Sequence, residues 1–237
     1  MPTNAIHSFD SHGDFDGDGI ADLVVGTGTR SATGSVYIFA GPLSGTITDT
    51  DADASLDNAG DESAVTATAF EVAAAGDLDH NGLDDLAVGY TEGGAGTGEG
   101  ELFVMSGPWS GVGHLVDSAA HVSGEHAYDN LGTCVANAGD VDGDGVADIL
   151  VSAEGYDVDG AAYLFYGPLS GELSLTSGAM FVGHTEHQGT TMNCAGAGDL
   201  NGDGNADLAI AAGGTWDFSL NRVESPGRVY FVPGGGF

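Results

Sequence analysis

The sequence predicts an all-β protein: a β-propeller of four blades, each a four-stranded antiparallel sheet. Two observations carry this prediction. One acidic phrase occurs four times at a near-constant period, and each copy is followed by an aromatic and β-branched run that ends in a Gly/Pro turn. The chain also holds 42 glycines, which suits a fold with many tight turns, and no segment has a helical period of useful length.

The acidic phrase sets the period of the fold. It reads GDFDGDGIADLVV, GDLDHNGLDDLAV, GDVDGDGVADILV and GDLNGDGNADLAI, beginning at Gly13, Gly76, Gly139 and Gly198. Successive copies therefore begin 63, 63 and 59 residues apart. Four-stranded units that repeat at this length are typical of propeller blades, whereas the repeats of a solenoid, the structural alternative, are usually shorter.

Each period holds four strands. A small-residue run precedes the acidic loop, a second strand begins at its Asp-Leu or Asp-Ile pair, an aromatic run such as VYIF follows, and a weaker apolar stretch comes after the GPLSG-type turn. The fourth repeat stops after its third strand, so we expect 15 strands and a last blade of three. We expect one domain, 1–237, with repeats at approximately 6–66, 67–129, 130–188 and 189–237.

The acidic loops have the ligand spacing of a calcium site. Counted from the first aspartate, positions 1, 3, 5 and 9 carry oxygen side chains and position 6 is always glycine. Position 7 varies, as expected where a backbone carbonyl is the ligand. Calcium takes six to eight oxygen ligands, and alternate residues of a tight turn can point to one centre. The predicted ligands are Asp14, Asp16, Asp18, Ile20 and Asp22; Asp77, Asp79, Asn81, Leu83 and Asp85; Asp140, Asp142, Asp144, Val146 and Asp148; and Asp199, Asn201, Asp203, Asn205 and Asp207.

Other interpretations of these loops fit less well. A solvated acidic turn explains the Asp-Gly pairs but not the fourfold ligand spacing. An EF-hand needs a glutamate at position 12, where this chain has Val25, Val88, Val151 and Ile210. Zinc is disfavoured because these positions hold no Cys or His, and magnesium prefers sites that keep several waters. We therefore predict about four calcium ions.

The tandem GD-x-[DN]-x-[DN]-G-x-x-DL loop followed by G-x-V-Y-x-F resembles the FG-GAP repeat of integrin α-subunit propellers and related bacterial proteins. The resemblance covers essentially the whole chain. It implies a calcium-stabilised propeller that is extracellular or periplasmic, or at the cell surface, and that is adhesive or ligand-binding. Propellers of this family commonly have about seven blades, whereas this sequence has four repeats.

The net charge of the chain and the absence of known catalytic motifs limit the classes of function that the sequence supports. The chain has 36 acidic residues against three arginines and a formal net charge of -33, which excludes nucleic acid and repels an anionic membrane. No apolar run is long enough to cross a membrane. Motifs of hydrolases, nucleotide-binding proteins and metalloproteases are absent, and the clustered aspartates belong to the loops, so we expect no enzyme. His184 and His187 have only weak metal-site spacing, and Cys134 and Cys194 are either bridged or two buried thiols.

The loops that join the second strand to the third, and the fourth strand to the next repeat, are expected on the edge of the blades opposite the acidic loops. These loops differ in length and content between repeats, which suits recognition. The longest of them, 213–227, holds Trp216, Phe218 and Arg222, which are candidates for binding a protein or glycan ligand. Alternatively, the two aromatic residues fill a groove between blades. A calcium-stiffened spacer in a larger secreted protein, or a part of a carbohydrate-active enzyme, are the other functional interpretations.

Ring closure has more than one solution. The Ala/Gly-rich first strands permit close approach at a narrow axis, which favours a four-bladed monomer. Two chains could instead join into a dimeric eight-bladed ring, or the four repeats could be part of a larger propeller.

Overall fold

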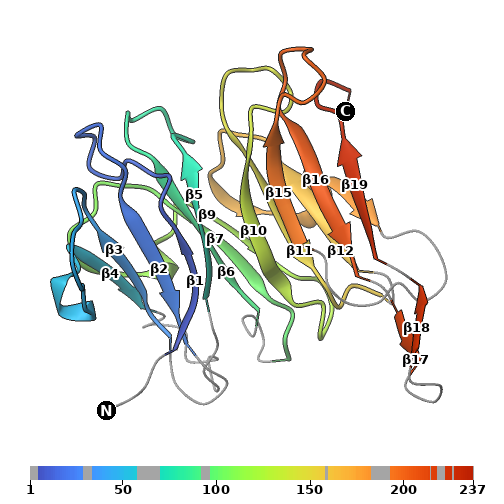
Figure 1. Cartoon of the computed structure of the whole chain (residues 1–237), viewed down its shortest axis with the longest axis horizontal. Helices are drawn as coiled ribbons and strands as arrows, with labels where there is room; N and C mark the ends of the chain where they lie inside the picture. Colours follow the sequence, from blue (N-terminus) through green and yellow to red (C-terminus); the bar gives the residue numbers. More distant parts are fainter. Residues whose placement is uncertain are drawn as a thin grey trace.

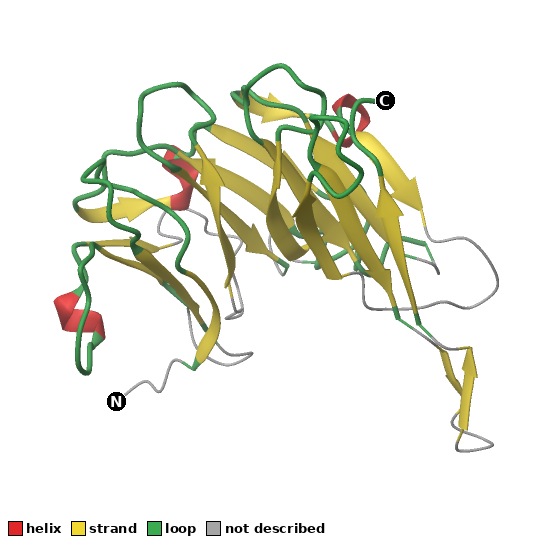
Figure 2. Cartoon of the chain, turned by 45° about the horizontal axis from the view of Figure 1, so that its top comes forward, coloured by secondary structure: helices red, strands yellow, loops and turns green. Residues whose placement is uncertain are grey.

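The structure is a computed structural model. It describes residues 5–28, 34–57, 70–91, 97–157, 160–182, 193–213, 215–217, 222–225 and 227–236. Within them, four sheets of three to five strands and one two-stranded hairpin make the protein all-β. The four sheets, here called blades 1 to 4, lie side by side in a row with blades 1 and 4 at opposite ends (Figure 1). A turned view shows that the row is an arc (Figure 2).

The predicted four-strand pattern is confirmed in blades 1 to 3, and blade 4 has three described strands. Neighbouring strands within this pattern are antiparallel. Blade 1 contains β1 (Ile6–Asp10), β2 (Leu23–Thr27), β3 (Val36–Phe39) and β4 (Ala54–Asp57), and blade 2 contains β5 (Phe70–Gly76), β6 (Asp85–Tyr90), β7 (Glu101–Met105) and β9 (Ala120–Ser123). Blade 3 contains β10 (Leu131–Gly139), β11 (Asp148–Ala153), β12 (Ala161–Phe165) and β14 (Ala179–Val182), and blade 4 contains β15 (Asn193–Gly198), β16 (Asp207–Ala212) and β19 (Arg228–Val232).

The expected total of 15 strands is too low, because the described residues form 19 strands, four more than predicted. Two of them, β8 (Gly111–His114) and β13 (Gly171–Leu173), follow the Gly-Pro turn of one repeat and join the sheet of the preceding blade. There β8 pairs in parallel with β4, and β13 pairs in parallel with β9. We call β8 and β13 latch strands. The hairpin of β17 (Thr215–Asp217) and β18 (Arg222–Ser225) lies in the segment that the sequence analysis treated as a loop.

A histidine–carboxylate pair crosses each latch. On β8, His114 lies 2.6 Å from Asp57 of β4, and on β9, His121 lies 2.9 Å from Glu172 of β13. The Asp57 carboxylate raises the pKa of His114 by hydrogen bonding and by its charge. The described residues form three single 3-10 turns, η1 (Asp49–Asp51), η2 (Leu115–Asp117) and η3 (Leu175–Ser177), and none of them could cross a membrane.

The hydrophobic core lies between the blades, because side chains alternate along each strand and each inner blade is covered on both of its faces. Val24 and Ile38 of blade 1 pack in one cluster with Val88 and Phe103 of blade 2. A second cluster joins blades 2 and 3 through Leu102, Val104, Ile149 and Tyr163. A third joins blades 3 and 4 through Leu150, Leu164, Leu208 and Ile210. Each inner blade is therefore stabilised by its two neighbours.

The first strands of consecutive blades contact one another along the inner edge of the row: β1 with β5, β5 with β10 and β10 with β15. Glycine is required where these backbones meet. A Cβ atom at Gly196 of β15 would clash with the carbonyl oxygen of Asn137 of β10, and one at Gly89 of the second strand β6 would clash with that of Gly132 of β10. This close approach explains why small residues precede the acidic loops of repeats 2 to 4, whereas the corresponding strand of repeat 1 reads IHSFD.

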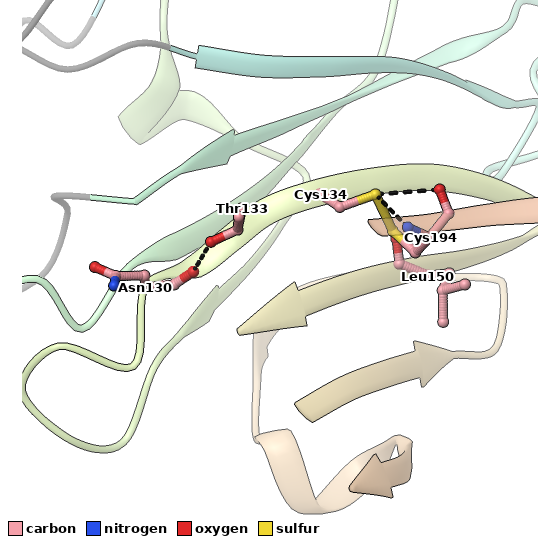
Figure 3. Close-up of a disulfide and its surroundings, with 5 residues drawn as sticks. All are labelled: Asn130, Thr133, Cys134, Leu150 and Cys194. Atoms are coloured by element: carbon pink, nitrogen blue, oxygen red, sulfur yellow. Dashed lines mark hydrogen bonds between the residues drawn. A yellow bond between two sulfur atoms is a disulfide. The ribbon is translucent and has the colours of Figure 1, made fainter. Parts of the chain in front are cut away.

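Cys134 and Cys194 form a disulfide, which decides between the two states that the sequence left open. The bond joins β10 to β15 and so cross-links blades 3 and 4 across 60 residues of sequence (Figure 3). The backbone N–H of Cys194 also lies 2.9 Å from the Cys134 sulfur.

Replacing both cysteines, as Cys134→Ser with Cys194→Ser, should lower the free energy of unfolding by about 2–4 kcal/mol, because the unfolded chain loses a cross-link. Guanidinium denaturation measures this loss, and wild type in reducing agent is the matched control. Equal stability of the oxidised wild type and the double variant would contradict the prediction.

Candidate metal centres

The four acidic loops connect the first two strands of each blade. They therefore all lie at one edge of the row, the upper edge in Figure 1. The loop edge also carries the turns after the third strands. The hairpin β17–β18 projects from the opposite edge (Figures 1 and 2). The hairpin, which is the described part of the variable segment 213–227, therefore lies at the edge opposite the repeated turns, as expected.

Each loop curls around the carboxylate of its first aspartate. In repeat 1, one Asp14 oxygen accepts a hydrogen bond from the N–H of Gly17 at 2.8 Å, and the other accepts from Gly19 at 2.9 Å. Gly19 has a φ of 81°, in the left-handed region that favours glycine. Asp140 and Asp199 hold the corresponding glycine N–H groups of their loops in the same way. The first carboxylate thus fixes the bend on which the ligand spacing depends.

The side chain at position 5 orders the following part of the loop. Asp18 accepts from the N–H of Ile20 at 2.7 Å, and the same bond joins Asn81 to Leu83. Asp144 with Val146, and Asp203 with Asn205, repeat it. The residues predicted to bind through their backbone carbonyls are therefore held by their N–H groups at the same place in every loop.

Carboxylates converge in three of the four loops. Ligand atoms within 4.8 Å of one another come from Asp14, Asp16 and Asp18; from Asp77, Asp79 and Asp85; and from Asp140, Asp142 and Asp148. All are oxygens, the donors that a hard cation such as calcium prefers. Like charges this close repel strongly unless a cation lies between them.

The aspartate at position 9 has a role that the sequence analysis missed. Asp22, Asp85, Asp148 and Asp207 are all buried. In blade 3, one Asp148 oxygen accepts from the N–H of Val141 at the start of the loop, and the other accepts from Gly167 in the turn after β12. Asp22 and Asp207 make the same pair of bonds. The carboxylate therefore ties the acidic loop to the Gly-Pro or Pro-Gly turn of its own blade.

Blade 2 departs from this pattern. The Oδ2 atom of Asp85 accepts from the N–H of Leu78 at 2.8 Å, whereas the buried Oδ1 atom has no hydrogen bond of regular geometry within the described residues; the Ser106 side chain interacts with this carboxylate and partly offsets the rise in its pKa that burial causes. A buried carboxylate oxygen without a partner is costly. Burial, together with the charges of Asp79 and Asp77, raises the pKa of Asp85 to about 6. A cation in this loop would satisfy the free oxygen, so the residues fit a metal ion.

The loop of blade 4 is organised by an amide. The Asn201 Nδ2 group donates to Asp203 at 2.9 Å and to Asp207 at 3.3 Å. Hydrogen bonds, first from the N–H of Asn205 and then from Asn201, lower the pKa of Asp203. This loop relieves its charge repulsion internally, and we expect its affinity for a cation to be the lowest of the four.

A groove of about 500 Å³ runs along the inner edge of the row, lined by Asp10, Glu71 and other residues of the first strands, and by Asp84 of the second acidic loop. Burial raises the pKa of Glu71 to about 7, and His7 lies 3.5 Å from its carboxylate. The small-residue runs of the sequence indicated close strands but not this acidic groove.

The predicted recognition residues are placed only in part. Trp216 lies on β17 and Arg222 on β18, where Trp216 pairs with Val223. Their side chains lie outside the described part of the structure, as do Phe218, His184 and His187.

Family models match every repeat of the chain. An FG-GAP repeat model matches residues 10–39, 69–105 and 195–232, and an FG-GAP-like repeat model matches 140–210. Integrin alpha pat-2 of Caenorhabditis elegans is 29% identical over 84% of this chain and 17% of its own length. Integrin alpha-5 of Xenopus laevis is 29% identical over 85% of the chain and 19% of its own length. The chain spans less than a fifth of the length of these relatives.

Two aspartates of one loop should separate the structural role from the metal role. Asp148→Ala leaves two buried N–H groups without an acceptor and should lower the free energy of unfolding by about 2–4 kcal/mol even in EDTA. Asp144→Asn, at an exposed position of the same loop, keeps the side-chain oxygen that accepts from the N–H of Val146, as Asn81 does for Leu83, and should lower stability only when calcium is present. Urea denaturation with and without calcium measures both, and equal losses in EDTA would contradict the distinction.

The metal-free protein should be more stable at pH 5 than at pH 7.5. Burial raises the pKa of Asp85 and Asp148 to about 6 and that of Glu71 to about 7, above the values near 4 of the unfolded chain. The folded state then binds more protons in this interval, so stability falls as pH rises through it. Melting temperatures in EDTA measure the slope, and Glu71→Gln should reduce it. A higher melting temperature at pH 7.5 would refute the prediction.

Proposed function

The chain belongs to the FG-GAP repeat family, and we propose that it is a calcium-binding β-propeller module that binds a protein or glycan outside the cell. The observation that carries the calcium assignment is the convergence of carboxylate oxygens in three loops of identical spacing. Positions 1, 3, 5 and 9 and the backbone carbonyl of position 7 would hold each ion. Calcium would supply no chemistry to a reaction here, since its role is to neutralise and brace the loops.

The charge of the whole chain supports a structural role for the cation. Four bound calcium ions would change the formal net charge from -33 to -25 (four times +2) and would do so where the carboxylates are most crowded. The repulsion that opposes folding would fall in the loops that join the first two strands of every blade. Calcium binding and folding should therefore be coupled.

A location outside the cell is favoured by three features. The disulfide between blades 3 and 4 persists in oxidising compartments. Short exposed calcium loops suit the millimolar calcium of the extracellular space, and the similarity to integrin alpha subunits points the same way. The extracellular side, the periplasm and the cell surface all meet these conditions.

The recognition surface that we propose is the edge opposite the acidic loops. The loop edge repeats nearly the same turns in every blade, whereas the hairpin β17–β18 on the other edge is found, among the described residues, in blade 4 alone and carries Trp216 and Arg222. A rigid spacer is the second candidate function. It is favoured by the latch strands and the disulfide, which tie each blade to the one before it.

Removing calcium should clearly lower the melting temperature, because the clustered carboxylates then repel one another. Calorimetry in EDTA, followed by titration with calcium or magnesium, measures the effect, and calcium should restore the transition at lower concentration than magnesium. A variant with Asp140→Asn, Asp142→Asn and Asp144→Asn should bind one ion fewer. An unchanged melting curve after complete demetallation would overturn the calcium assignment.

Binding of the calcium-loaded protein to a glycan array and to extracellular-matrix proteins tests the recognition role. Wild type should bind a member of one set, and the hairpin variant Trp216→Ala with Arg222→Ala should lose that binding while keeping its melting temperature. Val112→Ser, a surface change on β8, is the control. Absence of binding by the folded protein in both sets would favour the spacer.

A further inference from the structure

The outer side of blade 1 is an unpartnered apolar sheet face. A groove of about 690 Å³ lies on it, and we call its apolar lining the front face: Ile6, Phe9, Leu23, Val25, Tyr37 and Phe39. The exposed part of this face lies on β1, where Ile6 and Phe9 are 68% and 69% exposed, whereas Val25 and Phe39 are 8% and 5% exposed. Val24 and Ile38, which alternate with these residues, point the other way and pack against blade 2.

The same positions are buried in the next blade. From the strand registers, Phe9, Val25, Tyr37 and Phe39 of blade 1 correspond to Val72, Val88, Phe103 and Met105 of blade 2. Those four residues are at most 5% exposed and belong to the cluster between blades 1 and 2. A face of this kind is therefore covered wherever a blade precedes it.

The outer side of blade 4 also exposes apolar residues, on the sheet face that in the other blades packs against the following blade. We call it the back face, and it comprises Leu200, Val229 and Phe231. Val229 and Phe231 are 57% and 64% exposed, whereas the equivalent Leu102 and Val104 of blade 2 are 0% and 2% exposed. Leu200 corresponds in the loop to Leu78, which is buried with Leu102 and Val104 against blade 3. The back face is therefore covered wherever a blade follows it.

We propose that a second copy of this chain covers both faces: the front face of each chain packs on the back face of the other. The three interfaces within the chain already join a back face to a front face, so the contact continues an interface that the fold uses three times. The two faces of one chain lie at opposite ends of the row (Figure 1). Two such contacts close a ring of eight blades, within the range of known propellers.

Two features make this interface weaker than those within the chain. Asp49 of η1 stands where η2 and η3 have Leu115 and Leu175, which are buried against the preceding blade. Blade 4 also offers no described strand beyond β19 that could receive a latch. Each copy carries a net charge of -33, so repulsion opposes the contact, and calcium and salt should favour association.

Light scattering coupled to size exclusion, in calcium at high ionic strength and over a range of protein concentration, tests the proposal. The expected mass is twice the 23.6 kDa of the chain, with dissociation when salt and calcium are removed. Phe9→Asp on the front face and Phe231→Asp on the back face should each give monomers. Tyr128→Asp is the matched control, because Tyr128 is 72% exposed but lies between β9 of blade 2 and β10 of blade 3, away from both faces.

Mixing the two variants distinguishes head-to-tail packing from other contacts. Each variant keeps one intact face, so the mixture should form a dimer through one interface, whereas neither variant alone should. A monomeric wild type under all conditions would overturn the proposal. The two faces would then be covered either by each other, in a ring closed within one chain, or by further blades of a longer polypeptide. Loss of dimer in only one variant, or in Tyr128→Asp, would also overturn it.

Discussion

The fold depends on one buried carboxylate in each blade. The aspartate at the ninth loop position is removed from solvent, and in blades 1, 3 and 4 its two oxygens bind backbone N–H groups of two different turns. Burying a charge is costly unless hydrogen bonds and a counter-charge compensate for it. Here the hydrogen bonds come from the blade, and the counter-charge would come from a cation beside the neighbouring carboxylates. The acidic loop is therefore a structural joint as well as a candidate ligand set.

Around these joints, the blades are thin sheets that cannot bury their apolar faces alone. Their cores are the three clusters between neighbours, and these are reinforced by the latch strands and, between blades 3 and 4, by the Cys134–Cys194 bond. Stability in such an array is a sum of nearest-neighbour contacts, so its two end blades are the least stabilised. The exposed front and back faces are the direct consequence of this arrangement.

Much of this organisation is local and could be predicted from the sequence. The four blades follow from the repeat, the strand limits follow from the alternation and the Gly/Pro turns, and the calcium loops follow from oxygen side chains at fixed spacing. Asp14, Asp16 and Asp18 lie within five residues, so their convergence is a property of one turn. The small residues of the first strands likewise indicated the close approach that Gly196 makes to Asn137.

Only the tertiary structure decided the contacts between distant segments. The latch strand β8 pairs Val112 with Ser55, and no hydrophobic period identifies such a parallel pair between two repeats. The cysteine pair stayed open because bridging requires two Cα atoms to lie within about 7 Å, a distance that packing of β10 against β15 sets. The second role of Asp148 was hidden for the same reason: its partner Gly167 lies 19 residues away. Spacing along the chain determines what one turn can bind, whereas the packing of blades determines which turns and faces meet.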